Sequence, residues 1–189
     1  TTDNFGSSVN LGTNVMVVGF PNDSYDETDT NGLTNAGSAY VYQYNDTWTL
    51  LQKIVGWGRD RNNGDLAGAS VWYQDGFAFI GAPGHNYDIN DTNYLAGAGA
   101  VYVWQWSGSD WTYSQKITPS NRHAGDGFGS SITGDTGIVV IGAPTASYDS
   151  SNTNSVSNSG TVFVLSETNG IWSITQQISA SSRNINDGF

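Results

Sequence analysis

Apolar residues in this chain recur with the period of two that is typical of β-strands, and no segment has the 3.6-residue period of a helix. The segment around residues 39–44 is an example. Tyr40, Tyr42 and Tyr44 share one face of an extended strand, while Ala39 and Val41 share the other. Because both faces are apolar, we expect this strand to lie in a sheet that is covered on both sides.

The pattern occurs three times. The segment VMVVGFP (residues 15–21) returns as FAFIGAP (77–83) and IVVIGAP (138–144), and WTLLQKI (48–54) returns as WTYSQKI and WSITQQI. Each copy contains four strand-like segments. A repeat of this kind indicates one supersecondary unit that stacks on copies of itself.

The four segments differ in character. The first is short and made of small residues, and the second ends in a Gly-x-Pro turn. The fourth places Trp48, Leu50 and Ile54 opposite Thr49 and Lys53, which predicts an edge strand with one face in solvent and a Lys that discourages edge pairing. A small first strand suits a crowded axis and the fourth suits a wider rim, as in a β-propeller blade. A β-solenoid is the alternative.

We therefore expect an all-β fold of β-propeller-type blades, each a four-stranded antiparallel repeat of about 61 residues. The expected repeats are residues 1–64, 65–125 and 126–186, and residues 187–189 begin a fourth. Three blades alone would leave two apolar faces bare. We therefore expect the chain to be a slice of a longer array or to associate with further copies, in a ring or a fibre.

Together, the motifs FGSS, GAP, GxVYV and QKI resemble the FG-GAP repeat of integrin α-chain propellers and many microbial and algal surface proteins. The resemblance extends over essentially the whole chain. It implies β-propeller blades, an extracellular or cell-surface location, and a role in adhesion or assembly. Calcium-binding copies in that family carry an Asp-x-Asp-x-Asp-Gly type loop before the GAP strand. That position here holds LGTN, YQDG and TGDTG, so this calcium site does not carry over.

The composition excludes several classes of partner and binding site. The formal net charge is −11 with only 6 Lys and Arg, which argues against nucleic acid as a partner. The absence of Cys excludes a disulfide scaffold and thiolate zinc sites. No apolar run has the length that membrane insertion requires.

The longest loop of each repeat, residues 25–37, 87–99 and 148–160, is rich in oxygen-bearing side chains. Calcium prefers several oxygen ligands from flexible loops. The candidate ligands are Asp26, Asp29, Asn31, Asp88 and Asp149. The alternative is that these residues accept hydrogen bonds from their own backbone in Asx-turns and no cofactor is bound.

An Arg precedes the repeated Asp by four residues in every copy. The pairs are Arg61 with Asp65, Arg122 with Asp126 and Arg183 with Asp187. Since binding residues rarely recur in every blade, we expect a structural role in which Arg bridges carbonyls or the carboxylate between adjacent blades.

Trp57, Trp72 and Tyr94 break the repeat and so are free of its packing role. They suggest the alternative function, a carbohydrate-binding, lectin-like propeller. The opposing interpretation is ordinary surface variation.

Three N-glycosylation sequons, at Asn22, Asn45 and Asn90, lie in expected loops where a glycan fits. Their number is no greater than chance gives, so the sequons alone do not establish a glycoprotein.

No catalytic motif accompanies the two histidines, His85 and His123. We therefore expect a non-enzymatic extracellular structural or adhesion module, part of a larger surface or filamentous assembly. Its expected partners are further blades or copies of itself, and in the alternative also glycans.

Overall fold

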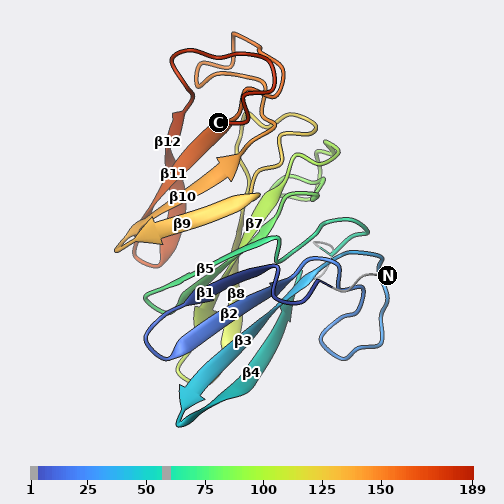
Figure 1. Ribbon diagram of the computed structural model, residues 1–189, viewed down its shortest axis with the longest axis vertical. Helices are drawn as coiled ribbons and strands as arrows, with labels where there is room; N and C mark the ends of the chain where they lie inside the picture. The colour runs from blue at the N-terminus through green and yellow to red at the C-terminus, as the bar shows by residue number, and fades with distance from the viewer. Residues whose placement is uncertain (1–3, 57–60) are drawn as a thin grey trace.

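The structure is a computed structural model that describes residues 4–56 and 61–189. These residues form three four-stranded antiparallel sheets and no helix (Figure 1). No helix long and apolar enough to cross a membrane is present among them. The expected all-β fold of propeller-type blades is confirmed.

Each sheet takes its strands in chain order, from a first strand to a fourth. The first sheet contains β1 (Ser8–Leu11), β2 (Val15–Phe20), β3 (Ser38–Asn45) and β4 (Thr47–Val55). The second contains β5 (Ser70–Gln74), β6 (Phe77–Ala82), β7 (Ala100–Trp106) and β8 (Trp111–Ile117). The third contains β9 (Ser131–Asp135), β10 (Ile138–Ala143), β11 (Thr161–Thr168) and β12 (Ile171–Ile178).

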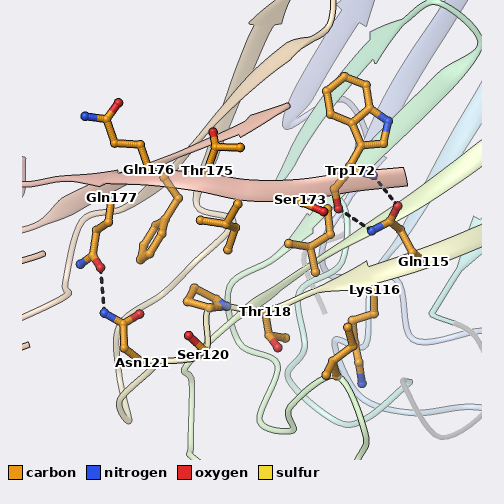
Figure 2. Close-up of a pocket in the computed structure, with 15 residues that line it drawn as sticks. Gln115, Lys116, Thr118, Ser120, Asn121, Trp172, Ser173, Thr175, Gln176 and Gln177 are labelled. Atoms are coloured by element: carbon orange, nitrogen blue, oxygen red, sulfur yellow. Dashed lines mark hydrogen bonds between the residues drawn. The ribbon is translucent and has the colours of Figure 1, made fainter. Parts of the chain in front are cut away.

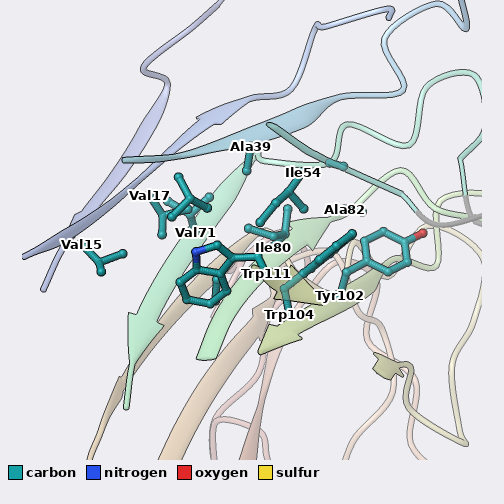
Figure 3. Packing of buried hydrophobic residues seen from close by; sticks show 13 residues of the cluster. Val15, Val17, Ala39, Ile54, Val71, Ile80, Ala82, Tyr102, Trp104 and Trp111 are labelled. Atoms are coloured by element: carbon teal, nitrogen blue, oxygen red, sulfur yellow. The ribbon is translucent and has the colours of Figure 1, made fainter. Parts of the chain in front are cut away.

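Two apolar layers hold the three sheets in a stack. One layer joins the first sheet to the second through residues such as Val17, Val41, Tyr102 and Trp104 (Figure 3). The other joins the second sheet to the third. The first strands contact one another, β1 against β5 and β5 against β9. The stack does not close into a ring, because the first and third sheets lie on opposite sides of the second (Figure 1).

Small residues allow the sheets to approach closely at the first strands. A Cβ on Gly81 would lie 2.1 Å from the carbonyl oxygen of Gly129, two residues before β9 of the next sheet. In the same place the Ser70 hydroxyl donates a hydrogen bond of 2.7 Å to that oxygen, and Ser8 does the same to Gly68 at 2.8 Å. A larger residue at Gly81 would force the two backbones apart.

The expected face assignment of the fourth strand is wrong, because a β-bulge interrupts it. The register between β3 and β4 shifts after Val41, which pairs with Gln52. Trp48 and Leu50 therefore lie on the outward face of the first sheet, 40% and 50% exposed, while Ile54 lies on the inner face at 1%. Alternation holds only on each side of the bulge.

The environment of the Lys in the fourth strand also differs from the expected solvent-facing position. Lys53 is largely buried, and its Nζ lies 2.8 Å from Asp23 Oδ2 and 2.7 Å from Asp29 Oδ1. Lys116 is buried beside Asp91 in the second sheet. These Lys residues form ion pairs with the loop between the second and third strands instead of pointing into solvent.

Within the described residues, only the middle sheet has an apolar layer on both faces. The outward face of the first sheet, here called the front face, carries Val9, Leu11, Tyr42, Tyr44, Trp48 and Leu50. The outward face of the third sheet, here called the back face, carries Val140, Val162, Val164, Gln176 and Ile178. Leu11 is 63% exposed and Ile178 is 37% exposed, so both faces present apolar surface to solvent.

Candidate functional site

The recurring polar groups of this chain lie at the junctions between the sheets. The linkers 61–67 and 122–128 and the segment 183–189, here called straps, run along the long loop that precedes them. Gly64, Leu66 and Ala67 donate backbone hydrogen bonds of 2.9–3.1 Å to the carbonyls of residues 34, 35 and 36. Equivalent bonds join the second strap to residues 96–98 and the third to residues 157–159.

The repeated Arg fixes each strap to this loop. Arg122 is buried and its Nη2 donates to the carbonyl oxygens of Asn86, at 2.8 Å, and Asn93, at 2.5 Å. Arg61 donates to Ser24 and Asn31 in the same way. Arg183 donates to the carbonyls of residues 147 and 154. These carbonyls belong to the long loop of the repeat that contains the Arg, so the contact is made within a repeat.

The repeated Asp closes a turn inside the strap. Asp65, Asp126 and Asp187 each accept a hydrogen bond of 2.6–2.7 Å from the backbone N–H three residues earlier. Burial raises the pKa of Asp126, and the N–H of His123 opposes this effect. Asp65 lies 3.3 Å from Nδ1 of the buried His85, which places this His in the packing between strap and sheet.

The long-loop carboxylates are surrounded by hydrogen-bond donors. Asp26 accepts from the backbone N–H groups of Thr28, Thr30 and Asn31, and from the Asn31 side chain. Asp88 and Asp149 accept the equivalent bonds in their loops. The pKa of Asp26 is lowered mainly by the N–H of Thr30, and that of Asp88 mainly by the N–H of Thr92. For Asp149 the main cause is the Ser151 hydroxyl.

This geometry does not fit the calcium hypothesis. A cation at Asp26 would have to displace N–H and O–H donors, and Asp29 is engaged by Lys53. No group of three or more His, Cys, Asp or Glu that could hold a metal occurs in the described ranges 4–56 and 61–189. The carboxylates form the Asx-turn arrangement that the sequence offered as the alternative.

Two of the three aromatic residues that break the repeat lie within the described part of the chain, on different elements. Trp57 lies outside the described residues. Trp72 is half-buried in the middle of β5, where its Nε1–H donates to Gln74 at 2.9 Å. Tyr94 is exposed in the β6–β7 loop, with its ring 5.3 Å from that of Tyr87.

The three sequons differ in exposure. Asn45 at the β3–β4 turn and Asn90 in the β6–β7 loop are exposed, whereas Asn22 is half-buried.

A groove of about 430 Å³ lies between the fourth strands of the second and third sheets (Figure 2). Its walls carry amide and hydroxyl groups, including Gln115, Thr118, Asn121 and Gln177. Asn121 Nδ2 donates a 2.7 Å hydrogen bond to Gln177 across the groove. A second groove of about 780 Å³ lies between the first and second sheets, beside Gln52 and Trp111.

Each groove is crossed by one Gln that bonds to the backbone of a Trp on the next sheet, here called the amide clamp. Gln52 Nε2 donates to the Trp111 carbonyl and Gln52 Oε1 accepts from the Trp111 N–H, both at 3.0 Å. Gln115 makes the same two bonds to Trp172 at 2.9 Å. The signal for the clamp in the sequence is the Gln that recurs in WTLLQKI, WTYSQKI and WSITQQI.

Comparison with known proteins agrees with this architecture. A family model described as the FG-GAP repeat matches residues 1–42 and 111–165, which together make up more than half of the chain. No curated protein matches the chain. The matched residues include β1, β2 and the first part of β3 in the first sheet, and β8 to β10 with the first part of β11 in the second and third sheets. The chain belongs to the FG-GAP repeat family.

Proposed function

We propose that this chain is a non-enzymatic structural or adhesion module of the cell surface or extracellular space, built into a larger assembly through its front and back faces. The observation that carries the proposal is the apolar surface of these two faces. Leu11 and Leu50 on the front face are at least half exposed. Apolar patches on end repeats favour contact with further blades or copies.

Two further features support the proposal. FG-GAP repeats are typical of extracellular and surface proteins, and this chain belongs to that family. The repeated Arg, Asp and Gln side chains contact the chain's own backbone at the junctions. Structural roles account for these contacts, and the proposal therefore assigns no reaction to them.

Light scattering tests the assembly. We expect the chain to associate above its monomer mass of 20.2 kDa. Leu50→Lys on the front face should reduce this association, because a charge would be desolvated in the contact. The matched control is Ile89→Lys, at a residue of similar exposure in the β6–β7 loop, which should leave association unchanged. A wild-type protein that stays monomeric at high micromolar concentration would overturn the proposal.

Carbohydrate binding is the second candidate, favoured by the amide and hydroxyl lining of the groove between β8 and β12. Such groups suit a neutral polyhydroxylated ligand. Binding on a glycan array that is lost in Asn121→Ala but kept in Asn45→Ala would support it. An array with no binding would remove it.

Glycosylation at the exposed Asn45 and Asn90 would fit a surface protein. Intact mass before and after glycosidase treatment of native material tests this. An unchanged mass would exclude it.

A further inference from the structure

We propose that a second copy of this chain docks head to tail, with the back face of one copy on the front face of the next and Gln176 clamping the backbone of Trp48. This inference rests on the proposed function and specifies its partner. Three observations at the internal junctions support it: the composition of the paired faces, the amide clamp, and the contact at the first strands.

At both internal junctions the third strand of the later sheet presents large side chains, and the third strand of the earlier sheet presents Val. Tyr102 and Trp104 of the second sheet pack on Val17 and Val41 of the first (Figure 3). At the other junction, Phe163 and Leu165 of the third sheet pack on the second sheet, which presents Val101 and Val103.

The front face and the back face have the same two compositions that meet at each internal junction. The front face presents Tyr42 and Tyr44, at the positions that Trp104 and Trp106 occupy in the second sheet. The back face presents Val162 and Val164, at the positions of Val101 and Val103. An aromatic face and a Val face therefore remain uncovered, one at each end of the stack.

The amide clamp gives the docking its direction. Gln52 and Gln115 stand at the bulge of β4 and β8, opposite Val41 and Val103. Gln176 stands at the same bulge of β12, opposite Val164, and is exposed, since none of the sheets formed by the described residues packs on that face. Figure 2 shows its side chain on the other side of β12 from Gln177, which bonds to Asn121 across the groove.

The acceptor strand of the clamp is present at the other end of the stack. Trp48 is the second residue of β4 and pairs with Tyr44, as Trp111 pairs with Trp106 in the second sheet. The backbone N–H and C=O of Trp48 therefore point to the edge of the first sheet, in the orientation that the Trp111 backbone has toward Gln52.

The first strands supply a second matching pair. At the internal junctions Ser8 and Ser70 donate to Gly68 and Gly129. Ser131 occupies the equivalent place on β9 and is exposed. Gly6 occupies the place of Gly68 before the first sheet, and its N–H donates to Gly19 at 3.0 Å as the N–H of Gly68 donates to Gly81 at 2.9 Å. In the docked pair the Ser131 hydroxyl donates to the Gly6 carbonyl of the second copy.

Docking of two front faces or of two back faces forms neither the amide clamp nor the contact at the first strands. Two front faces bring together two Trp48 backbones without a Gln, and two back faces bring together two Gln176 side chains without an acceptor backbone. Head-to-tail docking is the arrangement that uses both. It closes into a ring of two copies or propagates into a filament, depending on the rotation between copies.

Site-specific crosslinking tests the arrangement, and the chain has no native Cys to interfere. One protein carries Gln176→Cys and another carries Thr49→Cys, next to Trp48. A short bis-maleimide crosslinker is calibrated on the equivalent internal pair, Gln115→Cys with Ser173→Cys in one chain. We expect the mixture of the two single variants to crosslink between chains at least tenfold more than either variant alone.

A second measurement checks the clamp itself. Gln176→Ala should weaken self-association about tenfold, because two hydrogen bonds are lost and the Trp48 backbone stays unpaired. The control Thr175→Ala, at the neighbouring exposed residue, should leave it unchanged.

The outcomes separate the two proposals. Suppose that the wild-type protein associates in light scattering. Crosslinks between copies of the same variant would then overturn head-to-tail docking and leave the proposed function standing. The absence of crosslinks between the two mixed variants, while the internal pair reacts, would do the same. Equal association of Gln176→Ala and wild type would also overturn it. A wild-type protein that is monomeric in light scattering would overturn both.

Discussion

Carboxylates of the same type have opposite electrostatic roles in this chain. Hydrogen-bond donors lower the pKa of Asp26, Asp88 and Asp149 below the ordinary value of 3.8. Burial raises the pKa of Asp126 above it. The ionised loop carboxylates therefore stabilise the fold above their unfolded-state pKa, and this stabilisation is lost as pH falls through the folded values. Ionised Asp126 has the opposite effect and opposes folding at neutral pH.

Two isosteric substitutions should separate these effects. At pH 7, Asp149→Asn should lower the urea midpoint, because the amide accepts the loop donors less strongly than the carboxylate. Asp126→Asn should raise the midpoint at pH 7, because burying a neutral amide costs less than burying a charge. The Asp126→Asn difference should shrink first, as pH falls through the raised pKa of the wild-type Asp126. The Asp149→Asn difference should shrink only below about 4, where the unfolded-state carboxyl begins to be protonated while the folded one is still ionised.

The measurement is urea unfolding followed by Trp fluorescence between pH 7 and pH 3. A lower midpoint for Asp126→Asn at pH 7 would show that its hydrogen bond to the His123 N–H matters more than its burial.

At the residue scale the sequence located the polar groups but left their partners open. It predicted Arg contacts with carbonyls, and the structure places those carbonyls in the loop of the same repeat. The partners of Lys53 were not foreseen, since they depend on how the loop carrying Asp23 and Asp29 folds back over β4. Periodicity within strands carries no information on such loop paths.

At the scale of the elements, the bulge in the fourth strand decides which side chains cross a junction. It places Gln115 opposite Val103 and turns it toward the third sheet. The sequence predicted the four strands and their antiparallel order but not this bulge, because an inserted residue leaves the apolar composition unchanged while it reverses the alternation. The assignment of Trp48 and Leu50 to the same face as Ile54 was wrong for this reason.

Removing the Gln of the amide clamp at a junction between two sheets should lower the free energy of unfolding more than removing the equivalent Gln on the exposed back face. Gln115→Ala should reduce the free energy of unfolding by about 2 kcal/mol, because the N–H and C=O of Trp172 lose their partners in a half-buried place. The matched control Gln176→Ala removes the same side chain from the exposed back face and should cost less than about 0.5 kcal/mol.

Urea unfolding at sub-micromolar concentration, where copies do not associate, measures both values. Equal losses in the two variants would mean that the Gln contributes through its own strand and not across the junction.

At the scale of the whole molecule, the fold class and the threefold repeat could be predicted because every copy has the same strand pattern. The number of sheet faces covered by a neighbouring sheet was only partly predictable. Two apolar faces on every third strand suggested a sheet covered on both sides, and among the sheets of residues 4–56 and 61–189 this holds for the middle one alone. Composition within one repeat does not reveal whether a neighbour is present.

Hydrogen exchange should follow this difference in coverage. Backbone amides of β6 and β7, in the middle sheet between both apolar layers, should exchange at least tenfold more slowly than those of β2 and β3, whose sheet has one bare face. Mass spectrometry of peptides from 77–82, 100–106, 15–20 and 38–45 measures the rates on dilute protein. Equal protection in the two sheets would show that the stack opens as one cooperative unit.

The straps also determine where this chain can be divided for protein engineering. A fragment that ends after Ile117 keeps every strand of the second sheet but loses Arg122 and the strap N–H donors, which leaves the carbonyls of residues 96–98 without partners. A fragment that ends at Phe128 keeps them. The unit that can be moved between proteins is therefore one sheet together with the strap that follows its fourth strand. Blades exchanged between chains should be joined after that strap.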